Sequence, residues 1–172
     1  MHTLIVGPRQ MGKSTLIARV LESIDRPLFG YMTKKETALH DEVLGDPVYI
    51  YDIGAPRIQT AENLVGHCRD NRSFSNIEAF DRYAEKLRRS IPEGHLIVMD
   101  EIGFMEARSE AFSGAVLSLL DGDTPILAAV KDKDIPFLQK VRSHPNCRCF
   151  FITEENRDEL FTEVLSFVRS QI

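Results

Sequence analysis

The stretch that decides the fold is Gly7-Pro8-Arg9-Gln10-Met11-Gly12-Lys13-Ser14, which satisfies the pattern G-x-x-x-x-G-K-[ST]. It follows the apolar run Leu4–Val6, which predicts a buried strand, and it precedes apolar side chains at helical spacing. These apolar side chains are Leu16, Ile17, Val20, Leu21 and Ile24. An ordinary glycine turn is the alternative, but the strand before the motif and the helix after it favour a phosphate-binding loop (P-loop).

The residue types of this loop suit a nucleoside triphosphate. Gly7 and Gly12 let backbone N–H groups approach phosphate oxygens, and the start of the following helix adds positive potential. Lys13 is expected to reach the β- and γ-phosphates, and the Ser14 hydroxyl is expected to ligand Mg²⁺. The predicted nucleotide-binding residues of this segment are Gly7, Pro8, Arg9, Gln10, Met11, Gly12, Lys13, Ser14 and, as a helix residue near the site, Thr15.

A second chemical signal is Leu96-Ile97-Val98-Met99-Asp100-Glu101, an apolar strand with two acids at its carboxyl end. Open α/β sheets bind ligands at that end of their strands. The segment resembles a Walker B motif, in which Asp100 holds Mg²⁺ directly or through water and Glu101 orients or deprotonates the attacking water. Acids also begin ordinary loops, but beside a P-loop they predict a hydrolytic site with Glu101 and Lys13 as its catalytic residues.

The order of patterns predicts an α/β fold of the P-loop NTPase type, with a mostly parallel sheet flanked by helices. Apolar runs at Leu28–Thr33 and Val48–Ile53 predict an antiparallel hairpin or meander after the first helix. Ser75-Asn76-Ile77-Glu78 indicates a capping box, in which Ser75 accepts from the Glu78 amide, and the helix is expected to run to Pro92. Further along, we expect strands at 96–99, 126–130 and 149–152, and helices at 109–120, 135–141 and around 160–168.

Length and composition bound the other expectations. A chain of 172 residues with 43% hydrophobic content predicts one domain over residues 1–172. The net charge of -5 provides no global positive field for nucleic acid or an anionic membrane surface, and no apolar stretch nears the roughly 20 residues that span a bilayer. The odd set of cysteines (Cys68, Cys147 and Cys149) and the lack of a signal peptide before the first strand indicate a cytoplasmic protein. Cys147 and Cys149 could be redox-active or ligate metal, but alternation in a strand favours a structural pair.

Three segments resemble a known family. Asp100-Glu101-Ile102-Gly103-Phe104-Met105-Glu106, followed by Ser109 and Phe112, resembles the D-E-I-G-x-M-E-x-x-S-x-x-F signature of the small nucleoside-triphosphatases, which include the cancer-related nucleoside-triphosphatase and thermophilic relatives. Gly30-Tyr31-Met32-Thr33 and Thr153-Glu154-Glu155-Asn156-Arg157 resemble the family's G-[FY]-x-T and T-x-E-N-R segments. The resemblance implies a P-loop α/β fold and slow Mg²⁺-dependent hydrolysis of ATP, GTP and other nucleoside triphosphates to the diphosphate and phosphate.

Carried over by motif, Gly7, Gly12, Lys13 and Ser14 would bind phosphate and metal, Asp100 would serve the metal and Glu101 the water. The role of Glu106 is undefined. Arg157 is a further nucleotide-binding candidate, although it could equally bond to acids at a helix start. Asn156 could instead cap that helix, with Glu159 three positions later.

The chain departs from the family after the G-[FY]-x-T segment. Relatives carry a glutamate and an arginine there, whereas this chain has Lys34-Lys35-Glu36-Thr37. If that arginine stabilises transition-state charge, another cation must replace it or turnover will fall. The candidates are Arg9, Lys34, Lys35, Arg69 and Arg72, and each is also compatible with a solvated surface.

Two other function classes stay open. In a kinase, Lys131, Lys133, Lys140 and Arg142 could belong to a lid over two phosphorylated substrates, but Glu101 would activate the water that a kinase must exclude. A non-catalytic switch or cofactor-assembly partner is supported by the missing arginine. Val130–Asp134 does not match N-K-x-D, so a dedicated GTPase is not expected. A nucleoside triphosphate with Mg²⁺ is the expected ligand, and a stimulating protein partner stays open.

Overall fold

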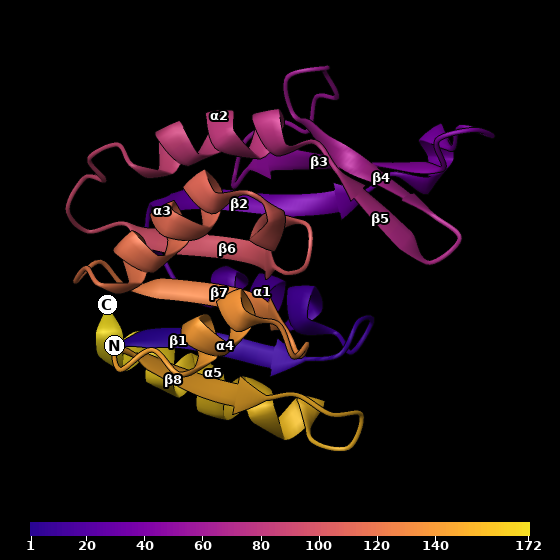
Figure 1. The fold of residues 1–172 in the computed structure, drawn as a ribbon. Helices are drawn as coiled ribbons and strands as arrows, with labels where there is room; N and C mark the ends of the chain where they lie inside the picture. Colours follow the sequence, from indigo (N-terminus) through magenta and orange to yellow (C-terminus); the bar gives the residue numbers. More distant parts are fainter.

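The computed structural model describes residues 1–172 and contains one eight-stranded sheet with helices on both faces (Figure 1). The strands are β1 (His2–Gly7), β2 (Leu28–Lys35), β3 (Asp46–Asp52), β4 (Leu64–Arg69), β5 (Arg72–Ser75), β6 (Leu96–Ile102), β7 (Ile126–Lys131) and β8 (Cys147–Phe151). Their order across the sheet is β5-β4-β3-β2-β6-β7-β1-β8. In this spatial order, the neighbouring strands β2, β6, β7, β1 and β8 are all parallel. The strands β2, β3, β4 and β5 form an antiparallel meander, and the two parts together confirm the predicted fold class.

Helices cover the sheet on two sides. On one face α2 (Ile77–Leu87), α3 (Glu110–Leu120) and α4 (Pro136–Arg142) pack over a cluster that includes Leu4, Val6, Ile97 and Phe112. On the other face α1 (Lys13–Glu22) and α5 (Arg157–Gln171) pack over a cluster that includes Ile5. Because β1, β6 and β7 are buried on both faces, their sequences are nearly continuous apolar runs.

The meander contains two strands that the sequence did not reveal. The strands β4 and β5 lie at the far edge of the sheet and extend beyond the helices (Figure 1). The edge strand β5 has Phe74 as its one large apolar residue, and in β4 the apolar residues Leu64 and Val65 are adjacent, so neither strand shows a clear apolar–polar alternation. Their turn places Asp70 at φ 48° and Asn71 at φ 60°, which is the left-handed geometry of a tight hairpin.

The predicted capping box at Ser75 is wrong. Ser75 is the last residue of β5 and pairs with Gly66, so strand pairing moves the helix start one residue along. Asn76 is the N-cap, and its side chain accepts a hydrogen bond of 3.3 Å from the Ala79 amide. Ser75 instead donates to the Met105 carbonyl at 3.3 Å.

The end of α2 also differs from the prediction. The helix stops at Leu87, ahead of the Pro92 that was expected to end it. Ile91 directly precedes that proline, a position where helical backbone is disfavoured, and its side chain still packs on the core from outside the helix.

The expected N-cap position of Asn156 is confirmed at the start of α5, but its expected capping hydrogen bond is not formed. Its Oδ1 accepts from the Thr153 amide at 2.8 Å, and its Nδ2 donates to the Phe151 carbonyl at 2.8 Å. The side chain therefore closes the turn after β8.

The three cysteines are free, and Cys147 and Cys149 lie partly buried against the core, as expected of structural residues. Turns of 3-10 type complete the fold at η1 (Thr37–Leu39) and η2 (Glu106–Arg108). None of the α-helices combines the length and the apolar composition that a membrane-spanning segment needs.

Candidate functional site

The carboxyl ends of three adjacent strands bring the predicted site residues together. The strand β1 runs into the P-loop, and its last residue Gly7 pairs with Lys131 at the end of β7. On its other side β7 pairs with β6, where Ala129 lies beside Asp100. A single strand thus separates the P-loop from the two acids, and all lie at the carboxyl ends of the parallel strands, where α/β proteins bind ligands.

Two glycines shape the P-loop. Gly12 has φ 95°, a left-handed conformation that L side chains rarely adopt, and it is the N-cap of α1, which begins at Lys13. A side chain at Gly7 would collide with Ile152, since a Cβ there would lie 2.6 Å from Cγ2 of that residue. These positions let the chain turn sharply from the buried strand into the helix.

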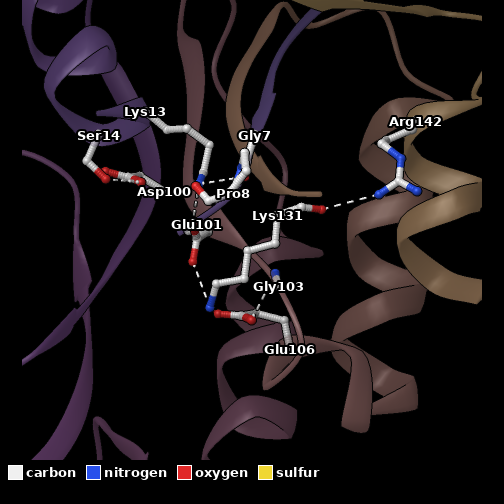
Figure 2. Close-up of polar contacts among 10 residues, drawn as sticks. All are labelled: Gly7, Pro8, Lys13, Ser14, Asp100, Glu101, Gly103, Glu106, Lys131 and Arg142. Carbon is white, nitrogen blue, oxygen red and sulfur yellow. Dashed lines mark hydrogen bonds and ion pairs between the residues drawn. The ribbon is translucent and has the colours of Figure 1, made fainter. Parts of the chain in front are cut away.

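Ser14 and Asp100 meet in this site. The Ser14 hydroxyl donates a hydrogen bond of 2.8 Å to Oδ1 of Asp100 (Figure 2). Burial raises the pKa of Asp100 to about 6, since the Ser14 hydrogen bond and the charge of Lys13 offset only part of the desolvation. A hydroxyl and a carboxylate are both oxygen ligands, and together they form a pair suited to a hard divalent cation.

Glu101 lies between two lysines. Nζ of Lys13 is 3.2 Å from its Oε2, and Nζ of Lys131 is 2.9 Å from its Oε1 (Figure 2). Lys13 also donates to the carbonyls of Gly7 at 2.9 Å and Pro8 at 2.6 Å. The P-loop lysine is therefore folded over its own loop and held close to the acid pair.

A third carboxylate lies beneath this network. Glu106 is 4% exposed, and its Oε2 accepts a hydrogen bond of 3.0 Å from the Gly103 amide. Burial raises the pKa of Glu106 to about 7, because the attraction of Lys131 and the backbone hydrogen bonds only partly compensate for desolvation. Glu106 thus closes the turn after β6 and adds negative charge below Lys131.

A cleft of about 1320 Å³ opens above these residues, between the P-loop, the ends of β6 and β7, and the β4–β5 hairpin. Arg9, Lys35, Arg69 and Arg72 line it, so four of the five candidate cations face this cleft. Lys34 does not line it and pairs with Glu36 at 3.6 Å. Arg69 is engaged by Asp70 at 3.3 Å, and Lys35 by Asp46 at 3.2 Å.

The remaining predicted residues lie around the loop. Arg9, Gln10 and Thr15 are exposed, and Met11 packs partly against the core. Arg157 is exposed at the start of α5 and does not line the cleft, so its role in nucleotide binding stays a prediction.

The four basic residues that could form a kinase lid do not all lie at the cleft. Lys131 and Lys133 line the cleft, Arg142 donates to the carbonyls of both, and Lys140 lies outside on α4. From the sequence, Lys131 was a candidate only for a kinase lid and Glu106 had no defined role, whereas in the structure Lys131 pairs with Glu101 and Glu106 binds the Gly103 amide. The signal for Lys131 was its position directly after the apolar run Ile126–Val130, at the carboxyl end of a predicted strand.

Comparisons with known proteins show the family to which this chain belongs. The chain matches the NTPase family over residues 2–165. The nucleoside-triphosphatase THEP1 of Pyrococcus abyssi is 31% identical over 98% of this chain and 93% of its own length. The cancer-related nucleoside-triphosphatase homolog of Bos taurus is 28% identical over 98% of this chain and 97% of its own.

Two solved structures share the fold. The solution structure of a human cancer-related nucleoside triphosphatase aligns with a TM-score of 0.67 at 25% identity, covering 98% of this chain and 97% of that one. The crystal structure of THEP1 from Aquifex aeolicus aligns with a TM-score of 0.65 at 22% identity, covering 98% and 99%. With the family match over residues 2–165, these findings show that the chain belongs to the nucleoside-triphosphatase (NTPase) family, as its motifs predicted.

Proposed function

We propose that this chain hydrolyses the terminal phosphoanhydride bond of nucleoside triphosphates at the site formed by the P-loop and the end of β6. One observation carries the proposal. The P-loop residues Lys13 and Ser14 contact the two consecutive acids of β6, with Lys13 bonded to Glu101 and Ser14 to Asp100. A phosphate-binding lysine, a metal-binding oxygen pair and a carboxylate near the reacting phosphate are the parts that phosphoanhydride hydrolysis requires.

The donor set fits Mg²⁺. Ser14 and Asp100 would hold the ion through oxygen, and no cluster of three or more His, Cys, Asp or Glu side chains competes for it elsewhere. Mg²⁺ keeps several waters and binds through few protein ligands together with substrate phosphates, which suits a pair of this kind. When bound, the ion would neutralise charge on the β- and γ-oxygens.

In the reaction, the oxygen of a water molecule forms a bond to the γ-phosphorus while the bond from that phosphorus to the β–γ bridging oxygen breaks. Glu101 would orient the water and accept its proton, and Lys13 would hold the β- and γ-phosphates. The backbone N–H groups of the P-loop, which Pro8 lacks, would enclose the phosphates. The products are the nucleoside diphosphate and inorganic phosphate.

The sequence and the fold support three further parts of the proposal: broad base tolerance, a single domain and a reducing compartment. The chain lacks the N-K-x-D guanine motif, which supports tolerance of different bases, and Arg157 stays a candidate for contact with the nucleotide. A single sheet that carries both apolar clusters supports one domain over residues 1–172. The free cysteines support a reducing compartment such as the cytoplasm.

A phosphate-release assay with ATP and with GTP, each with Mg²⁺ and with excess chelator, tests the proposal. We expect release from both nucleotides with the metal and none with the chelator. Tight binding with negligible release would favour the switch, and release that depends on an added phosphate acceptor would favour a kinase. Either result would overturn the hydrolase assignment for this site.

A further inference from the structure

Lys131 lies in the phosphate site although neither the P-loop nor the acid pair contains it. It is the last residue of β7 and pairs in parallel register with Gly7, the first P-loop residue. The neighbouring strand β6 delivers Asp100 and Glu101 on the opposite side of β7. The side chain of Lys131 therefore begins between the phosphate-binding loop and the acid pair Asp100–Glu101.

Its ammonium group forms an ion pair with Glu101. Nζ of Lys131 lies 2.9 Å from Oε1 of Glu101, while Lys13 holds Oε2 of the same carboxylate at 3.2 Å (Figure 2). Among the cations that line the cleft, Lys131 alone forms an ion pair with Glu101. The Lys131 side chain is 27% exposed, so its head group can reach the cleft.

The turn after β6 is shaped to receive this lysine. A Cβ at Gly103 would lie 2.9 Å from Cδ of Lys131, 3.3 Å from its Nζ and 3.2 Å from Oε2 of Glu106. The lysine stem thus crosses over a glycine, with a buried carboxylate close to its head group. A side chain at position 103 would fill the space that Lys131 occupies.

Lys131 is protonated and positively charged at neutral pH. Burial lowers the pKa of its ammonium group, but Glu101 and Glu106 raise it by more, so the pKa lies above its ordinary value. A charged group on a flexible four-carbon stem can exchange one anion for another without moving the backbone.

We propose that Lys131 is a second phosphate-binding residue, which exchanges Glu101 for the γ-phosphate of a bound nucleoside triphosphate and supplies from within the chain a positive charge for hydrolysis. This inference rests on the proposed function. The γ-phosphate carries more charge than one carboxylate and has three oxygens, so it competes well for the two ammonium groups that share Glu101.

The exchange has two consequences for the reaction. Lys13 and Lys131 contact different oxygens of Glu101, so they approach its carboxylate from two directions and are set to hold different oxygens of the phosphate. Charge in the transition state spreads over these oxygens, which makes a second cation most useful there. Transfer of both lysines to the substrate also frees both oxygens of Glu101 to bind the attacking water.

Lys131→Met tests the proposal by removing the charge while keeping the apolar stem, with Lys140→Met on α4 as a control for loss of a lysine outside the cleft. Three quantities are measured with Mg²⁺: kcat for phosphate release, the affinity for ADP, and the affinity for the non-hydrolysable imido analogue of ATP. We expect Lys131→Met to lower kcat by about 10²- to 10³-fold, as for removal of one preorganised electrostatic contact. Affinity for the imido analogue should fall at least about tenfold, while affinity for ADP stays that of the parent.

Two further variants separate a phosphate contact from a structural role. Lys131→Arg restores the positive charge, and its kcat should be at least about tenfold higher than that of Lys131→Met. Gly103→Ala keeps every charge but displaces the Lys131 stem, and it should lower affinity for the imido analogue more than affinity for ADP. Equal losses of ADP and analogue affinity in Lys131→Met would mean a structural role and overturn the inference.

Unchanged kcat in Lys131→Met would also overturn it. If the parent protein itself released no phosphate, the proposed function would fail, yet the difference between ADP and analogue affinities would still test Lys131. The two failures are therefore distinguishable.

Discussion

The hydroxyl of Ser14 donates a hydrogen bond of 2.8 Å to Oδ1 of Asp100 and so joins the first turn of α1 to the end of β6. The two residues are 86 positions apart in the chain. Their contact brings the P-loop hydroxyl that we propose as a metal ligand to the first acid of the second motif.

Asp100→Asn should weaken Mg²⁺ binding, because a neutral amide attracts a dication less than a carboxylate does. The Mg²⁺ concentration required for half-maximal phosphate release should therefore rise by at least about tenfold. A Mg²⁺ titration of turnover measures the effect. Asp123→Asn, on the exposed turn after α3, is the matched control and should titrate like the parent. Equal Mg²⁺ requirements in Asp100→Asn and the parent would remove Asp100 from the metal site.

Lys13→Ala should abolish nucleotide binding and turnover, because Lys13 is the P-loop cation whose reach matches the β- and γ-phosphates. Titration with a fluorescent nucleotide measures binding directly. The control is Lys140→Ala, which removes the same charge from a surface helix. Parent-like affinity in Lys13→Ala would show that the loop does not hold the phosphates through this lysine.

Glu101→Gln should lower kcat by about 10²- to 10⁴-fold, the usual contribution of a positioned general base, while nucleotide binding survives. The substitution keeps the size of the side chain and removes the basic carboxylate. Single-turnover phosphate release and an independent binding titration separate the two effects. If Glu101→Gln turned over like the parent while Lys13→Ala were inactive, the protein would bind nucleotide without using Glu101 as its base.

Glu106→Gln should stabilise the protein increasingly as the pH rises. Burial raises the pKa of Glu106 from 4.5 to about 7, so the unfolded chain ionises this group first and the folded state is penalised as the pH climbs through that window. Glutamine keeps an acceptor for the Gly103 amide and cannot ionise. The gain in unfolding free energy should be small near about pH 4 and reach on the order of 1 to 3 kcal/mol near about pH 8.

Urea unfolding of parent and variant at both pH values measures this difference, with Glu110→Gln on the exposed start of α3 as the control. A gain that is equal at the two pH values, or larger at the acidic one, would contradict the assigned titration of Glu106.

The sequence by itself determined the P-loop, the mostly parallel sheet and the family. Gly7 to Ser14 are consecutive, so the peptide chain alone brings their amides, lysine and hydroxyl to one place. Apolar runs such as Ile126–Val130 are buried on both faces and are readable as strands without knowledge of their neighbours. Local patterns of this kind depend on residues close in the chain.

Only the tertiary structure decided which distant residues meet. The helix cap moved from Ser75 to Asn76 because β5 pairs with β4, and no local pattern contains that pairing. Lys131 reaches Glu101 because β7 lies between β1 and β6, a strand order that the apolar runs do not encode. Burial of Glu106 and its altered pKa likewise arise from packing under the turn at Gly103. Such contacts join segments far apart in the sequence, so they depend on the strand order and register of the assembled sheet and on no single stretch of residues.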